Sequence, residues 1–228
     1  MIGFCHASSV TATQGPALDT STLGSSFRAF MKASQPWGVV VTLAITSTLR
    51  AVYGGPVTWR DAVVVATLVA LNPFMEWVLH VFVLHAKPFR IGKREVDLFA
   101  AVEHRRHHAE PRDAYGSLAP PRVALEVTVL SLLLAAAWPT WGMRLTALVT
   151  YGVLGGVYEW THFLIHCDYK PKSAYYRRLW VHHRLHHFRN EGYWFGVTRT
   201  LADSVLHTKP DKDDVPTSPT VKDILAAA

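Results

Sequence analysis

The chain has few cysteines and no pair of thiolates at metal-binding spacing. Cys5 and Cys167 are the only two in 228 residues, and no CxxC segment occurs. Neither a disulfide framework nor a zinc site built from thiolates is therefore indicated. A GxGxxG segment is also missing, so no dinucleotide-binding loop is visible. If the protein transfers electrons, they must reach it from a separate carrier.

Charged residues are also scarce, at 18%, whereas 50% of the residues are hydrophobic. The formal net charge is +6, but the basic residues stand beside apolar blocks and form no long tract with interleaved aromatic residues. This pattern favours a membrane protein and argues against a nucleic-acid partner. The eight tryptophans suit the interface between lipid and water.

The apolar residues are concentrated in four blocks. They cover residues 36–53, 61–85, 123–138 and 143–166. Since about 20 helical residues cross a bilayer core, the second and fourth blocks can cross it and project beyond it. The first and third contain Arg50 and Glu126, so we expect them to be short or tilted spans.

Basic residues gather in the connection 87–122 and in the C-terminal region 170–199, so both regions should face the cytoplasm. We predict an all-α integral membrane protein in which four transmembrane helices carry a cytosolic helical cap. Residues 1–35 and 211–228 are polar or poor in periodicity, and we predict that they are tails on either side of a membrane domain at 36–210.

Thirteen histidines are the anomaly of the composition. Ten of them form four clusters with the spacings HxxxxH, HxxHH, HxxxH and HxxHH. The clusters are His80 and His85; His104, His107 and His108; His162 and His166; and His183, His186 and His187. They lie at the ends of the two long blocks and in the two basic regions, so all four can meet beside the membrane.

Helical geometry gives these spacings meaning. Residues at i, i+3 and i+4 share a helix face, so each HxxHH segment is predicted to point at one spot. The HxxxxH pair differs, because five residues turn by roughly 140° around an α-helix. His80 and His85 can face one point only if the helix loosens or ends between them, and Pro88 makes an ending plausible.

Neutral imidazole is a good ligand for iron and zinc. Ten imidazoles are too many for one ion and about right for two, so we predict that all ten bind a pair of metal ions. A single cluster could instead be a satisfied core pair or a solvated basic face. The isolated His6 and His207 are expected to be surface residues, and His182 a hydrogen-bond partner behind the ligands.

The series of four histidine motifs resembles the fatty acid hydroxylase and sterol desaturase superfamily in order and spacing. The closest resemblance is to the fatty acid 2-hydroxylases that act on sphingolipid acyl chains. It spans roughly residues 70–210, and three stretches carry it: residues 80–89, 158–166 and 181–208.

Some positions depart from that resemblance. Glu159 stands where aspartate is usual, Trp194 where glycine commonly stands, and Cys167 where a further histidine is common. The fused cytochrome b5 domain of some relatives is not visible. None of these departures changes a predicted metal ligand. They bear instead on which substrate the protein binds.

The resemblance implies an O2-dependent hydroxylase of a lipid acyl chain, with two iron ions that zinc can replace in the isolated protein. Electrons would come from a cytochrome b5 or a ferredoxin with its reductase. The enzyme would lie in the plasma membrane of a bacterium or the endoplasmic reticulum of a eukaryote, with its histidines on the cytoplasmic side.

Ligating imidazoles usually donate their second N–H to a carboxylate or a carbonyl. The candidates to hold the ligands in this way are Glu76, Glu103, Tyr158, Glu159 and Asp203. For the acidic residues, an ordinary salt bridge is the alternative. Six aromatic residues could line an acyl channel or could simply be core or interface residues: Trp77, Phe82, Phe163, Tyr193, Trp194 and Phe195.

Other functions remain open at this stage. The nearest is a hydroxylase or desaturase that acts on a carotenoid, a sterol or an alkyl lipid. A membrane metal transporter is a second alternative, although its ligands would be expected near the middle of the bilayer. A metal-bound membrane protein without catalytic activity is the third.

Overall fold

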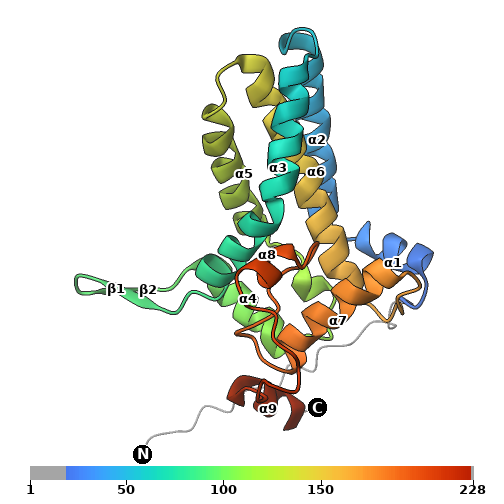
Figure 1. Ribbon diagram of the computed structural model, residues 1–228, viewed down its shortest axis with the longest axis vertical. Coiled ribbons are helices and arrows are strands. Elements are labelled where there is room, and N and C mark those ends of the chain that lie inside the picture. Colours follow the sequence, from blue (N-terminus) through green and yellow to red (C-terminus); the bar gives the residue numbers. More distant parts are fainter. Residues whose placement is uncertain (1–18, 227–228) are drawn as a thin grey trace, which may run out of the picture.

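The computed structural model describes residues 19–226 and consists mainly of helices (Figure 1). The longer helices are α2 (Ser34–Tyr53), α3 (Trp59–Leu79), α4 (Phe99–Ala109), α5 (Pro121–Ala136), α6 (Trp141–His166) and α7 (Ala174–Phe188). The shorter elements are α1 (Leu23–Phe30), η1 (His80–Leu84), β1 (Phe89–Ile91), β2 (Arg94–Val96), η2 (Tyr115–Ser117), α8 (Leu201–Val205) and α9 (Pro219–Ala226).

Helices α2, α3, α5 and α6 stand side by side and form an upright bundle (Figure 1). Helix α6 is its central member and packs against the other three. The four helices coincide with the four apolar blocks. Two segments, Trp59–Leu84 and Tyr115–Ala136, are long and apolar enough to cross a membrane. The arrangement of four spans remains a prediction.

Small residues bring α2 and α6 close together. Gly152 and Gly156 are spaced GxxxG on α6, and a Cβ atom on Gly152 would lie 2.7 Å from a methyl group of Leu43 on α2. Such spacing is typical of helices that pack closely in membranes, because small side chains let the backbones approach.

A buried polar cluster ties three helices at the end of the bundle remote from the histidines. Arg50 on α2 donates to Asp61 on α3 at 2.8 Å and to Thr146 on α6 at 2.7 Å. Asp61 also accepts from Thr146 and from the backbone of Thr58, where it completes a capping box at the start of α3. The charges of Arg50 and Asp61 are therefore paired and hydrogen-bonded within the apolar bundle.

The opposite end of the bundle carries a cap, in which α1, α4, α7 and α8 lie across the bundle axis (Figure 1). Buried residues from α6, α7 and the segment before α8 pack together there: Ile165, Leu179 and Val197. The cap is therefore continuous with the bundle through the end of α6.

The predicted N-terminal tail is too long. Residues 1–18 lie outside the described part of the chain, but α1 begins at Leu23 with a capping box made by Thr22 and Ser25. Ala29 and Phe30 are buried against Phe163 of α6. The sequence concealed this helix because it is short and rich in small residues.

The predicted C-terminal tail also contains packed residues. Val215 and Val221 are buried, and the side chain of Arg189 at the end of α7 donates to the carbonyl of Val215 at 2.7 Å. Ser218 donates to Glu191 and caps the start of α9. The few apolar side chains of this polar segment are therefore enough to dock it on the cap.

The fold is not purely helical, because β1 and β2 form an antiparallel hairpin. The hairpin projects sideways from the cap (Figure 1). Gly92, with a φ of 60°, is the first residue of its two-residue loop, where a type II′ turn requires glycine.

Candidate metal centre

The ten clustered histidines come together as two groups of five. Within each group, one ring nitrogen from every residue lies within 4.8 Å of the others. Group one comprises His80, His85, His104, His108 and His186. Group two comprises His107, His162, His166, His183 and His187. His6 lies outside the described residues, and His207 is exposed.

A π-helix resolves the geometry of the HxxxxH pair. The five residues of η1 continue α3, and the backbone N–H of His85 donates to the carbonyl of His80, which is an i to i+5 hydrogen bond. The wider turn places residues five apart above one another, and the two rings stack with centroids 5.1 Å apart. The α-helix therefore loosens between these histidines, as their spacing requires.

The prediction that each HxxHH segment points at one spot is wrong. On α4, His104 and His108 contribute to group one, whereas His107 contributes to group two. On α7, His183 and His187 contribute to group two and His186 to group one. The reason is that successive residues diverge by about 100° around an α-helix, so the adjacent histidines of each motif face different ways.

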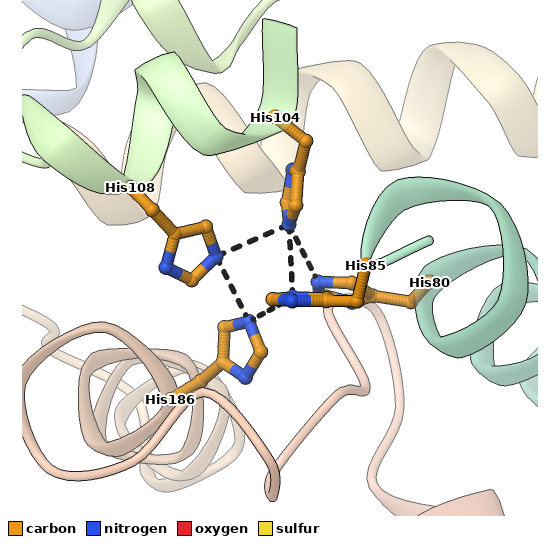
Figure 2. Close-up of side chains that lie close together, drawn as sticks. All are labelled: His80, His85, His104, His108 and His186. Carbon is orange, nitrogen blue, oxygen red and sulfur yellow. Dashed lines mark hydrogen bonds between the residues drawn. The ribbon is translucent and has the colours of Figure 1, made fainter. Parts of the chain in front are cut away.

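Group one is built around His104 (Figure 2). Its Nε2 atom lies 3.1 Å from the Nε2 atoms of three other members: His80, His85 and His108. His186 completes the group from α7, with its Nε2 3.1 Å from those of His85 and His108. One nitrogen carries at most one proton, so hydrogen bonds alone do not account for these contacts.

Group two lies beside it and uses the end of α6. The Nε2 atom of His183 is 3.0 Å from the Nε2 atoms of His162 and His187. His107 and His166 complete the group, with ring centroids 4.4 Å apart. The two groups touch where the rings of His108 and His187 stack at 4.1 Å.

The donor set fits metal ions. The Nδ1–H groups of His80, His166 and His186 donate to backbone carbonyls, so their Nε2 atoms carry lone pairs toward the group centres. Two nitrogens at right angles around an ion about 2.1 Å away would be about 3.0 Å apart, which is close to the separations seen here.

Group two shows the same need for a cation. Buried ring nitrogens that have no hydrogen-bond partner include the Nε2 atoms of His107 and His166. Buried polar atoms are normally hydrogen-bonded or bound to metal, because leaving them unpaired costs free energy. The orphaned nitrogens of His107 and His166 are therefore explained if they bind an ion.

Burial keeps the cap imidazoles neutral. It lowers the pKa of His85 to about 4. It also holds the pKa well below 6.5 for six others, with repulsion from neighbouring imidazoles as the next cause: His104, His107, His108, His183, His186 and His187. A neutral imidazole is the form that binds metal, so the site is prepared for ligation.

Backbone carbonyls, rather than carboxylates, hold several ligands. The Nδ1–H of His80 donates to Phe195 at 2.6 Å, that of His186 to Tyr193 at 2.7 Å, and that of His166 to Pro111 at 2.8 Å. Sequence reasoning missed all three, since a carbonyl leaves no mark on the identity of its residue. Their positions just after the HxxHH motifs were the only signal.

Asp203 organises the backbone around the carbonyl of Phe195. It is fully buried and accepts from the backbone N–H groups of Phe195 and Gly196 at 2.9 and 2.7 Å, and from His182 at 2.9 Å. These donors outweigh burial and lower its pKa. A Cβ atom on Gly196 would lie 2.1 Å from the carbonyl oxygen of Arg199, so this close approach requires glycine.

The other proposed supports do not contact the imidazoles through hydrogen bonds. Glu76 accepts from Thr198 and Asn72, and Glu159 accepts from the backbone of Ala119. Glu103 forms a salt bridge with a nearby arginine, as the alternative interpretation expected. The ring of Tyr158 packs on His162, with centroids 5.6 Å apart. Glu76 therefore secures the same loop as Asp203, but from its other end.

The six aromatic residues have different environments. Phe195 packs on three rings of group one, and Trp77 lies between Phe195 and the exposed Phe82. Phe163 instead belongs to the core beneath α1. Trp194 is buried, with a φ of 58° in the left-handed region that favours glycine.

Known proteins with similar sequences act on fatty acyl groups. A fatty acid 2-hydroxylase from Mus musculus is 32% identical over 138 residues, which are 59% of this chain and 36% of that protein. The dihydroceramide fatty acyl 2-hydroxylase FAH2 from Arabidopsis thaliana is 28% identical over 144 residues, or 60% of this chain and 58% of that protein. The chain thus spans less than two thirds of either relative.

The fold is also similar to a solved one. A structure of full-length scs7p, in which only the hydroxylase domain is visible, superposes with a TM-score of 0.59 and 20% identity, covering 88% of this chain and 71% of that one. In sequence, residues 65–208 match the fatty acid hydroxylase family, which is more than half of the chain. The chain therefore belongs to the fatty acid hydroxylase family.

Proposed function

We propose that this chain is a membrane-bound hydroxylase that uses two iron ions and O2 to hydroxylate a lipid acyl chain, most specifically at its 2-position. The observation that carries the proposal is the convergence of ten imidazoles into two groups of five. The fatty acyl 2-hydroxylases among its relatives support the substrate class.

Each group would hold one ion through five imidazoles. Bound iron supplies the redox chemistry that O2 needs to oxidise an unactivated C–H bond, which acid–base side chains cannot supply. Zinc fits the same nitrogens but has no redox chemistry, so zinc-loaded protein would be inert.

The chain's own residues orient these ligands. The carbonyls of Phe195, Tyr193 and Pro111 fix which ring nitrogen of their histidines faces the ion. Asp203 and Glu76 hold the loop that carries the carbonyl of Phe195. Such supports raise metal affinity by preventing rotation of the imidazoles.

The aromatic side chains give an acyl chain a route to group one. Phe82 is 63% exposed at the end of the candidate span Trp59–Leu84, and its ring packs on Trp77, which packs on Phe195 beside the group one imidazoles. We propose that an acyl chain from the adjacent leaflet lies along these rings, which exclude water from its reacting carbon.

Electrons would come from a separate protein such as a cytochrome b5 or a ferredoxin with its reductase. Exposed basic residues on the cap, such as Arg177 and Arg178 at the start of α7, suit an acidic carrier. We also propose that four helices cross the bilayer and that the histidines lie on its cytoplasmic side.

Metal content and lipid composition test the proposal together. Cells that make the chain should accumulate 2-hydroxy acyl lipids, and the purified protein should contain two iron ions. The pair His104→Ala and His108→Ala should empty group one, and the pair His183→Ala and His187→Ala should empty group two. Both should abolish the product, whereas His207→Asn on the surface should change nothing.

Other outcomes would refute the proposal. Products hydroxylated in a ring or along a carotenoid would assign another lipid class. Metal flux into vesicles without lipid oxidation would favour a transporter, although helices α4 and α7, which contribute to both histidine groups, lie at one end of the helical bundle (Figure 1). Unchanged lipids in both pairs of variants would identify a metal-bound protein without this catalysis.

A further inference from the structure

The β1–β2 hairpin takes no part in the histidine groups, yet it occupies a special position. It connects η1, which carries His80, to α4, which carries His104. It leaves the cap where the candidate span Trp59–Leu84 ends, and it points across the axis of the bundle (Figure 1). A hairpin with this direction would run along a membrane surface rather than away from it.

One face of the hairpin is apolar and uncovered. The register places Phe89 opposite Val96 and Ile91 opposite Arg94. Residues two apart on a strand point to the same side, so these four side chains share one face of the hairpin. Phe89 is 43% exposed and Ile91 is 64% exposed. An isolated two-stranded hairpin is only marginally stable in water, so contact of this face with another surface would stabilise it.

The same hairpin is basic. Lys87, Arg90, Lys93 and Arg94 are all exposed, and the acidic residues nearby are Glu95 and Asp97. Glu95 lies opposite Arg90 in the strand register, and Asp97 forms a salt bridge with Arg105 of α4. The tip and the strands therefore present an excess of positive charge next to exposed apolar side chains.

The base of the hairpin is held in place. Arg105, which follows His104 on α4, donates to the carbonyl of Ala86 at 3.1 Å and to the carboxylate of Asp97. The two ends of the hairpin are thereby clamped to the helix that supplies His104. Whatever surface holds the hairpin therefore also orients α4.

We propose that the hairpin is an interfacial anchor that lies on the bilayer beside the metal centre. Phe89, Ile91 and Val96 would enter the boundary between headgroups and acyl chains, and the basic side chains would bind the phosphates of anionic lipids. Apolar and basic residues on one short element are typical of such anchors. Arg94, on the apolar face, can extend its guanidinium to the headgroups.

The proposal is tested on the full chain in vesicles. In a Cys5→Ser, Cys167→Ala background, an environment-sensitive fluorophore is attached to Ile91→Cys, with Glu95→Cys on the opposite face as the matched control. Vesicles of phosphatidylcholine are compared with vesicles that also contain phosphatidylglycerol. We expect the label at 91 to be quenched by lipid-borne quenchers and the label at 95 by aqueous iodide.

Removing charge should loosen the anchor. Each of Arg90→Gln and Lys93→Gln should reduce the ratio of inserted to detached hairpin about fivefold in anionic vesicles, because each basic side chain near such a surface adds a similar attraction. Neutral vesicles should show little effect. Flotation of the unmodified chain with vesicles tests its membrane location separately, and iron content reports whether the variants keep the metal centre.

Two results would overturn the proposal. Equal access of iodide to both labels in anionic vesicles would mean that the hairpin is free in water. If the label at 91 is protected from iodide in native membranes but not in vesicles of pure lipid, the apolar face binds a protein partner instead. If the cysteine-free background does not fold, hydrogen exchange of residues 87–97 in the unmodified chain gives the same answer, since anionic lipid should slow it.

Discussion

Acidification of the metal-free protein should unfold the cap over a narrow pH range. Seven imidazoles outside the candidate membrane-spanning helices are buried or half-buried and have lowered pKa values. They are His85, His104, His107, His108, His183, His186 and His187. The unfolded chain would bind protons at these positions near pH 6.5, whereas the folded cap resists them.

The sign and size of the effect follow from this difference. Above about pH 6.5 both states are neutral at these positions, so the folded cap keeps its full stability. As the pH falls, the unfolded state takes up protons first, and stability is lost until the pH reaches the folded pKa, about 4 for His85. Each imidazole lowers the stability by about 1.4 kcal/mol per pH unit, so seven together lower it by roughly 10 kcal/mol per pH unit, which is similar to the whole stability of a domain.

The measurement is urea unfolding followed by tryptophan fluorescence, in micelles with a chelator, at several pH values. The pH dependence of the unfolding free energy gives the number of protons taken up. The metal-loaded protein should unfold at lower pH, because bound ions compete with protons for the same nitrogens. The variant His207→Asn, on the surface, should not change the slope. Uptake of fewer than about one proton would refute the reasoning.

Four substitutions test the loop behind the histidines, helix α1 and the far end of the bundle. Asp203→Asn should lower metal affinity in group one about 10- to 100-fold, because the loop that holds His80 loses its charged acceptor; calorimetric metal titration measures this, and unchanged affinity would contradict it. Gly196→Ala should destabilise the cap by several kcal/mol, because its Cβ atom would clash with the backbone. Gly24→Ala is the control: its Cβ atom would meet no atom within 4 Å, so it should stabilise α1 by up to about 1 kcal/mol. Thermal melts measure both changes. Asp61→Ala should destabilise the bundle by about 3–5 kcal/mol, because the largely buried Arg50 loses its carboxylate. Equal stability would show that Arg50 finds water or lipid phosphate instead.

The sequence alone predicted the parts of the site that depend on regular helix geometry. Four apolar blocks became four bundle helices, and the ten histidines of the four motifs converge at one end of the bundle. The i, i+4 relation correctly joined His104 to His108 and His183 to His187. These features follow from local periodicity, which a single sequence displays.

The remaining parts depend on tertiary contacts. The carbonyls that hold the imidazoles belong to residues whose side chains have no part in the interaction, such as Pro111. Glu76 and Glu159 are half-buried acids near the histidines along the chain, but each accepts from the backbone of a different loop. The packing of α1 depends on an aromatic cluster around Phe163, which no local pattern encodes.

The way the two groups share helices implies that they bind their metal ions together. Each group takes two histidines from the end of a bundle helix, two at i, i+4 from one cap helix, and one from the other cap helix. Helices α4 and α7 therefore each contribute to both groups, with their roles exchanged. An ion bound in group one fixes α7 through His186, and α7 carries two ligands of group two.

The second ion should consequently bind to a cap that the first has already ordered. The free-energy cost of ordering the cap then falls mainly on the first ion, so the second ion binds more tightly, which is positive cooperativity. We expect a titration of metal-free protein to yield mostly empty and doubly loaded chains, with native mass spectrometry as the measurement. A dominant singly loaded species at half saturation would mean that each group organises its ligands alone, and that the shared helices are rigid before metal arrives.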